Sequence, residues 1–139
     1  MSRFAPLAPG RGLPSLGGMT ESTTTLRLRL VFGQAAMLGP GKADLLGHIR
    51  DTGSIAAAGR AMSMSYKRAW SLVEEMNAAY REPLVLSARG GASGGGARLT
   101  ETGEAVLAGY RRIEEIALQA AGPEIAALEA MLVDMSGGK

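Results

Sequence analysis

The segment from Ser54 to Leu99 constrains the fold of this 139-residue chain more than any other part. It starts with small residues, passes a short turn at 62–65, and continues into an amphipathic stretch with Lys67 and Arg68 near its start. Two short β-prone stretches follow, on either side of residues 90–96, of which five are glycine. Two helices around a tight turn, followed by a hairpin, are the elements of a winged helix-turn-helix, so we expect that fold.

Capping residues and side-chain size support the two helices. Ser54 and Ser65 are suitable N-caps, because a serine hydroxyl accepts a hydrogen bond from a free backbone N–H in the first turn. The small residues 56–59 would let the second helix cross the first closely. Apolar side chains three and four residues apart in the second helix predict a buried face rather than a ligand site; they are Tyr66, Ala69, Trp70, Val73 and Met76.

The remaining elements frame this motif. Alternation from Thr24 to Phe32 predicts one half-buried strand, and Lys42–Asp51 is expected to be the first helix. Hairpin strands are expected at 84–89 and 97–99. Thr100 would cap a long helix, interrupted at Gly122-Pro123, before a last helix from Glu124 to about Asp134. The fold class is therefore mainly α (α+β). We expect the chain to be divided into a disordered tail 1–22, a winged helix-turn-helix 23–100, and dimerisation helices 101–139.

Composition and charge limit the functional classes. The chain has no cysteine, which excludes disulfides and thiolate metal sites and fits the cytoplasm, where we expect this protein. No apolar stretch approaches the roughly 18 residues of a membrane span, so no membrane contact is expected. Residues 1–100 carry 12 basic and 6 acidic side chains, whereas 101–139 carry 3 and 7. This uneven charge suits an N-terminal part that binds DNA, although ordinary surface charge explains it equally well. Met19 is an alternative start to Met1.

The second helix and the hairpin carry the candidate DNA contacts. A helix N-terminus attracts phosphate, an arginine can bind guanine through two hydrogen bonds, and glycine lets the backbone approach DNA closely. The alternative for the helix is a basic face that is only solvated, and the alternative for the hairpin is a glycine-rich loop whose charges are incidental. Tyr66 can donate to a phosphate or simply pack. The predicted DNA-binding residues are Ser54, Ser65, Tyr66, Lys67, Arg68, Ser71, Arg89, Gly90, Gly91, Ser93, Gly94, Gly95 and Arg98.

Catalysis and metal or cofactor binding are not expected. The glycine tip lacks the Gly-Lys-Ser/Thr ending and the following helix of a P-loop, which argues against nucleotide binding. His48 is the only histidine, so it offers neither a metal site nor much acid–base chemistry. The pairs Glu74-Glu75 and Glu114-Glu115 are interpreted as solvated helix faces.

From Leu45 to about Ile116 the chain resembles the N-terminal DNA-binding domain of ModE-type molybdate-dependent transcriptional regulators, a winged helix related to that of LysR-type regulators. The resemblance is carried by Ser65-Tyr-Lys-Arg-Ala-Trp, Glu75-Met-Asn, Pro83-Leu-Val, the glycine-rich tip and Leu99-Thr-Glu-Thr-Gly. The leading strand Leu26-Arg-Leu-Arg-Leu fits as well. The Ser-Tyr-Lys-x-Ala-Trp motif combined with the glycine tip is specific, whereas Leu-Thr-x-x-Gly occurs more widely.

The resemblance implies a homodimer held by the first and C-terminal helices, with each second helix of the motif in a major groove of a palindromic site. The C-terminal apolar stripe also exceeds what a small domain can bury, which independently indicates a partner chain; packing back on its own domain is the alternative. The predicted dimer residues are Leu45, Leu46, Ile49, Val106, Tyr110, Ile113, Ile116, Ile125, Leu128 and Leu132.

We therefore expect a sequence-specific regulator of double-stranded DNA, more simply a repressor than an activator. Members of the family continue into molybdate-binding β-barrels, and nothing in this sequence predicts such a barrel. A separate effector-sensing partner, another effector or no effector remain alternatives. Two rival functions stay open: a protein–protein interaction module, and a small enzyme or oxyanion-binding protein that uses the glycine tip.

Overall fold

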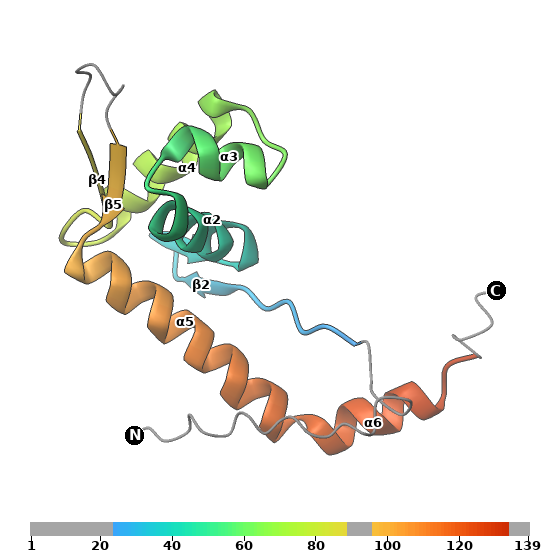
Figure 1. Ribbon diagram of the computed structural model, residues 1–139. Coiled ribbons are helices and arrows are strands. Elements are labelled where there is room, and N and C mark those ends of the chain that lie inside the picture. The colour runs from blue at the N-terminus through green and yellow to red at the C-terminus, as the bar shows by residue number, and fades with distance from the viewer. Residues whose placement is uncertain (1–23, 89–95, 134–139) are drawn as a thin grey trace.

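The computed structural model describes residues 24–88 and 96–133, and nothing is stated about the structure of the others. Five helices and two small antiparallel sheets make up this part of the chain (Figure 1). The elements in chain order are β2 (Leu30–Phe32), β3 (Ala36–Leu38), α2 (Pro40–Thr52), α3 (Ile55–Ala61), α4 (Tyr66–Ala79), β4 (Val85–Ala88), β5 (Gly96–Leu99), α5 (Glu101–Ala120) and α6 (Gly122–Ala130).

The N-terminal strand differs from its prediction. Instead of one strand over 24–32, a hairpin pairs Leu30 with Leu38 and Phe32 with Ala36, and residues 24–29 lead into it without strand pairing. The chain reverses at Gly33, whose φ of +56° favours glycine. The strand β3 was missed because three residues, Ala-Met-Leu, are too short to show an alternating pattern.

The two helices of the motif cross closely because their contact is made by small residues. A Cβ on Gly59 would lie 3.1 Å from the Cβ of Ala69, so even an alanine there would press on α4. The connecting turn places Ser63 at φ +57° and is closed by the Met64 N–H, which donates to the Gly59 carbonyl over 2.9 Å. The predicted turn is thus confirmed, and α3 ends at Ala61, one residue before its expected end.

One hydrophobic core joins α2, α3, α4, the wing strands and the first half of α5. Leu45, Leu46 and Ile49 on α2 are 0% exposed within this single chain, and Tyr110 on α5 is 1% exposed. Predicting these four as dimer contacts was wrong, because their side chains are covered by their own domain. The apolar spacing was recognised correctly, but periodicity does not tell which surface covers a stripe.

The wing strands β4 and β5 pair antiparallel, with Val85 opposite Leu99 and Leu86 opposite Arg98. They are joined to the helical part at two places. The Ala97 N–H donates to the carbonyl of Gly53, the αL residue that ends α2, over 2.9 Å. The Asn77 side chain on α4 binds the start of β4. These contacts fix the base of the wing beside the N-terminus of α3.

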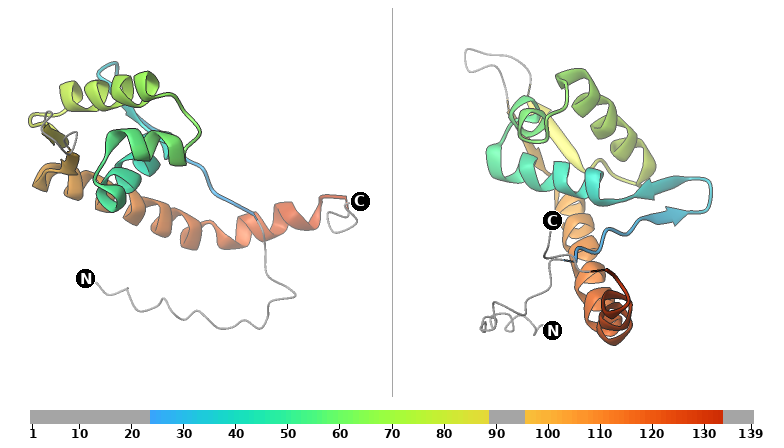
Figure 2. Two further views of the ribbon diagram at one scale, coloured as in Figure 1. Left: turned by 45° about the horizontal axis from the view of Figure 1, so that its top comes forward. Right: turned by 90° about the vertical axis from the view of Figure 1, so that its right-hand side faces the viewer.

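Helix α5 packs on the domain with its first half and then extends away from it, with α6 at its far end (Figure 1). The extended segment that begins at Thr24 lies along the distal part of α5 (Figure 2), and the Thr24 hydroxyl donates to the Glu129 carboxylate on α6. Nearer the domain, the Tyr110 hydroxyl donates to the Leu28 carbonyl over 2.7 Å. Arg111 forms a 2.7 Å ion pair with Asp44 on α2. Within the described ranges, no helix combines the length and apolar character needed to cross a bilayer.

Candidate nucleic-acid interface

The outward face of α4 is the centre of the candidate interface. Ser65 caps this helix, its hydroxyl accepting from the Arg68 N–H over 3.0 Å, so its first turn is held in place. Ala69, Val73 and Met76 anchor the buried side. The outward face lies on the opposite side of the helix. Its residues are spaced three and four positions apart, as helix geometry requires, and all are exposed; they are Lys67, Ser71, Glu74 and Ala78.

The first turn of α4 carries two cations. Lys67 and Arg68 are exposed, and among residues 24–88 and 96–133 no carboxylate forms an ion pair with either. The partial positive charge of a helix N-terminus adds to theirs. This end of α4 is therefore suited to binding an anion such as a phosphate group.

Two aromatic residues flank these cations. The Tyr66 ring is 57% exposed and meets Trp70 edge-on, with ring centroids 6.3 Å apart and an interplanar angle of 83°. Trp70 is half-buried at the margin of the core. The predicted buried face of this helix is therefore correct for Ala69, Val73 and Met76, holds only in part for Trp70, and is wrong for Tyr66.

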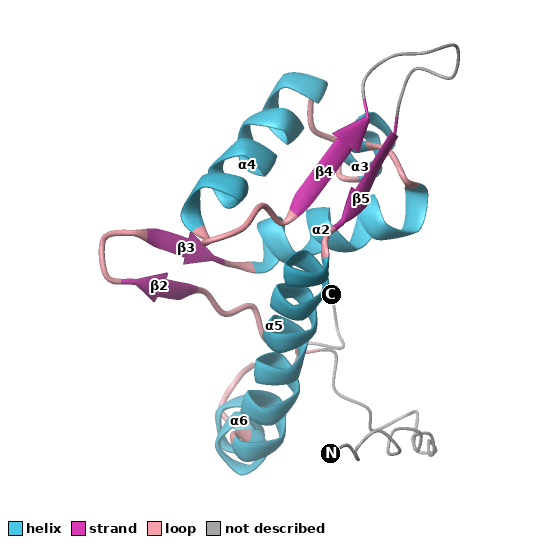
Figure 3. Cartoon of the chain, turned by 90° about the vertical axis from the view of Figure 1, so that its left-hand side faces the viewer, coloured by secondary structure: helices cyan, strands magenta, loops and turns pink. Residues whose placement is uncertain are grey.

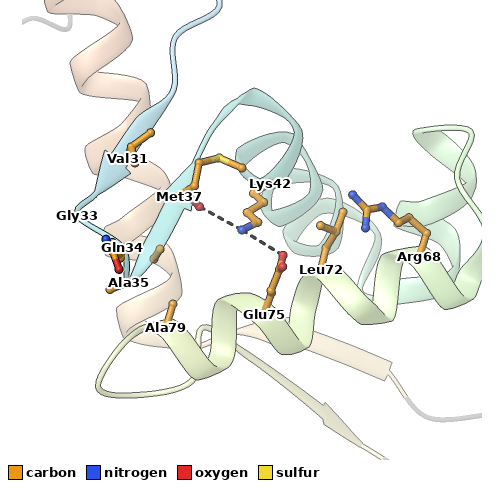
Figure 4. A pocket seen from close by; sticks show the side chains of 11 residues that line it. Val31, Gly33, Gln34, Ala35, Met37, Lys42, Arg68, Leu72, Glu75 and Ala79 are labelled. Carbon is orange, nitrogen blue, oxygen red and sulfur yellow. Dashed lines mark hydrogen bonds and ion pairs between the residues drawn. The ribbon is translucent and has the colours of Figure 1, made fainter.

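A shallow groove of about 450 Å³ separates α4 from the β2–β3 hairpin (Figure 4). Lys42 crosses it, donating to the Met37 carbonyl over 3.1 Å and pairing with Glu75 over 3.2 Å. Arg68 lies at one end of the groove. Sequence reasoning missed this Lys42–Glu75 contact, because it joins residues 33 positions apart whose adjacency only the fold creates.

The described part of the wing supplies one of the predicted contacts. Arg98 is exposed on β5, opposite Leu86. The other predicted wing residues, Arg89, Gly90, Gly91, Ser93, Gly94 and Gly95, lie outside the described residues. In Figure 3 strand β4 lies next to α4, to which the Asn77 side chain joins it, and β5 packs against α2. The described base of the wing is thus held beside α4.

Ser54 has a structural role in this region. Its hydroxyl accepts from the Ala57 N–H over 3.0 Å and caps α3, while the neighbouring Gly53 holds β5. The predicted site residues Ser54 and Ser65 are therefore both helix caps.

Asn77 is the main residue that sequence reasoning overlooked. Its Oδ1 accepts from the N–H groups of Leu84 and Val85 over 2.8 and 3.0 Å, and its Nδ2 donates to the Val85 carbonyl over 3.0 Å. This amide therefore fixes the wing relative to α4. The motif Glu75-Met-Asn contained it, but nothing in the local pattern indicated its partners.

The resolved pKa shifts belong to Tyr80, Tyr110 and Arg111, none of which is among the candidate DNA contacts, and burial raises the pKa of the Tyr80 phenol. Burial raises the pKa of the Tyr110 phenol, Glu114 raises it further, and Arg111 acts in the opposite direction. The hydrogen bond to Asp44 raises the pKa of Arg111 and keeps it charged. No group of three or more metal-ligating side chains occurs within the described ranges.

A helix-turn-helix followed by a two-stranded wing defines a winged helix-turn-helix domain, with α4 as the second helix of the motif. Comparison with solved structures agrees: the domain matches the chain in the crystal structure of the CbnR DNA-binding domain–DNA complex with a TM-score of 0.50. That match covers 63% of this chain and 95% of the other, at 24% identity, and shows the shared fold.

Sequence comparison places the chain among homologues of ModE-type regulators. It is 37% identical over 96 residues to the DNA-binding transcriptional dual regulator ModE of Escherichia coli K12, covering 69% of this chain and 35% of ModE. It is 38% identical over 104 residues to the molybdenum-pterin-binding protein MopA of Rhodobacter capsulatus, covering 75% of this chain and 39% of MopA. It is 47% identical over 79 residues to the molybdenum-pterin-binding protein MopB of the same organism, covering 57% of this chain and 29% of MopB. The chain thus spans less than two fifths of each relative, and no family model matches it.

Proposed function

We propose that this protein is a cytoplasmic, homodimeric transcriptional regulator that binds double-stranded DNA sequence-specifically through α4 and the wing. The observation that carries the proposal is the first turn of α4, where Lys67 and Arg68 are exposed, stand at a helix N-terminus and have no acidic partner within the described residues. Phosphate contacts from this turn would position the helix, and its outward side chains would contact base edges.

The relatives support this proposal from a separate direction. One is described as a DNA-binding transcriptional dual regulator, and the structural neighbour was crystallised with DNA. Of the residues predicted from sequence, Tyr66, Lys67, Arg68, Ser71 and Arg98 are exposed in this structure. The proposal assigns them to direct DNA contact and assigns Ser54 and Ser65 to holding two helix N-termini toward DNA. It assigns no catalytic step to the chain.

The proposed dimer rests on the distal helices. Seven of the eleven large apolar side chains that the described chain exposes lie at or after Ile113. A helix that leaves its domain with an apolar face uncovered is suited to pairing with a second copy, which would also place two recognition helices on one duplex. The predicted dimer contacts that remain partly or fully exposed are Val106, Ile113, Ile116, Ile125, Leu128 and Leu132.

We further propose that binding represses transcription by covering a promoter. The described residues form the proposed DNA-binding domain and the two distal helices. A protein that blocks a promoter simply by binding over it needs no additional surface. We also propose a separate effector-sensing protein as a partner of this regulator.

The experiment that tests the proposal is selection of duplexes from a random pool by the purified full chain at about 0.15 M salt, with and without molybdate. We expect enrichment of one palindromic sequence, and loss of that enrichment in Lys67→Ala/Arg68→Ala. A difference between the two conditions would show that this chain responds to molybdate. Absence of any enriched sequence would contradict DNA recognition and favour a protein–protein interaction module.

A further inference from the structure

Glu74 occupies an unexpected position on α4. It is exposed on the outward face, three residues after Ser71 and seven after Lys67, opposite the buried Leu72 and Met76. No cation within residues 24–88 and 96–133 forms an ion pair with it. The proposed DNA-binding face therefore has an uncompensated carboxylate near its middle.

The neighbouring Glu75 differs from Glu74 in both place and partner. It lies on the hairpin side of the helix, where it pairs with Lys42 over 3.2 Å, and Figure 4 shows the two side chains pointing toward each other. Glu75 therefore helps to hold the hairpin against α4. Glu74 makes no such contact, so the domain has no comparable structural use for it.

A carboxylate facing DNA is repelled by phosphates, and it gains a favourable contact only from a hydrogen-bond donor on a base edge. In the major groove these donors are the amino groups of cytosine N4 and adenine N6. Adenine also presents the N7 acceptor beside its amino group, which would repel a carboxylate, whereas cytosine presents only its donor. The side chains next to Glu74 along the outward face, Ser71 and Ala78, are small and allow close approach of the helix.

We propose that Glu74 is a specificity-determining residue that selects cytosine at one position of each half-site by accepting a hydrogen bond from its N4 amino group. This inference rests on the proposed function, since it requires that α4 enters the major groove. The proposal gives Glu74 a specific role, whereas the sequence pattern predicted only that it lies on a solvated helix face.

The test compares sequence selection by the wild-type chain, Glu74→Gln and the matched control Glu75→Gln. An amide of the same shape can donate to N7 and accept from N6, the paired contacts by which glutamine recognises adenine. We expect Glu74→Gln to change the preferred base at one position per half-site from cytosine to adenine, with relative affinity for the two bases changing about 5- to 150-fold. Non-specific affinity should rise, because a repulsive charge is removed.

Glu75→Gln should leave the base preference of the wild-type chain unchanged, because that carboxylate faces Lys42. An identical selected sequence for wild type and Glu74→Gln would overturn the inference while leaving the proposed function intact. If the wild-type chain selects no sequence at all, the proposed function fails and this inference fails with it. Thermal melting of both variants verifies that they remain folded, as expected for exposed side chains of unchanged size.

Discussion

Gly103 lies directly against the backbone of Leu84, so closely that a Cβ on Gly103 would stand 2.2 Å from the Leu84 carbonyl oxygen. The neighbouring Thr100 completes the junction: its N–H donates to the same carbonyl over 2.9 Å, and its hydroxyl accepts from the Gly103 N–H over 2.9 Å. The start of α5 is thereby fixed to the residue that precedes β4. This contact explains physically why the stretch Leu99-Thr-Glu-Thr-Gly ends in glycine.

We expect Gly103→Ala to lower the free energy of unfolding by about 1–3 kcal/mol, because the added methyl group must displace backbone rather than a flexible side chain. Urea denaturation followed by circular dichroism measures the change. Gly109→Ala on the same helix is the control, since no neighbouring group among the described residues lies within 4 Å of the place that its methyl group would take. That substitution should stabilise the protein by about 1 kcal/mol. Equal effects at the two glycines would contradict the close contact.

Asn77→Ala should destabilise the protein by about 1–3 kcal/mol, because the substitution leaves the N–H groups of Leu84 and Val85 without their side-chain acceptor. Thermal denaturation measures the loss, and Gln34→Ala in the exposed hairpin turn is the control. A melting temperature unchanged from wild type would show that Asn77 does not hold the wing to α4.

The stability of the domain should decrease at alkaline pH. Burial raises the pKa of Tyr110 above its ordinary value of about 10, so the folded state holds this proton more tightly than the unfolded state. Its contribution is therefore fully present below pH 10 and is lost as the pH rises through the folded-state pKa. Denaturant midpoints at pH 8 and 11 for wild type and Tyr110→Phe test this. A pH response of equal size in both proteins would exclude Tyr110 as its source.

Tyr110→Phe should also be less stable than wild type at pH 8, by about 0.5–1.5 kcal/mol, because the hydrogen bond to the Leu28 carbonyl is lost.

Ile116→Asp should convert a dimer into a monomer. Ile116 is 50% exposed on the distal half of α5, where burial against a second copy would be disrupted by a charged side chain. Sedimentation equilibrium measures the molecular mass, and Gln119→Asp, an exposed position on the same helix, is the control. A wild-type monomer, or a variant that still forms a dimer, would refute the proposed interface.

The sequence was a good guide wherever local signals decide the structure. The caps Ser54, Ser65 and Thr100 stand where they were predicted, each accepting a hydrogen bond from a first-turn N–H. The winged fold was predicted correctly for the same reason, since its helices and strands have distinct periodicities.

Long-range partners were beyond the reach of local pattern. The stripe on α2 was assigned to a dimer through the resemblance to the regulator family, whereas the domain itself covers Leu45, Leu46 and Ile49. Periodicity could not correct this assignment, because it identifies an apolar face without its covering surface. The contacts of Asn77 with β4 and of Lys42 with Glu75 likewise depend on how the chain folds back. The exposed face of α4 was predicted more fully, because surface charge at a helix N-terminus is a local property.

The most direct test of DNA recognition by α4 is the salt dependence of affinity for the selected duplex, measured by fluorescence anisotropy between about 50 and 300 mM salt. We predict a steep linear fall of log affinity with log salt concentration, and a slope smaller by about 1 in Lys67→Ala, because one phosphate contact is lost. An affinity that does not change with salt, or a slope that Lys67→Ala leaves unaltered, would contradict DNA binding through this helix.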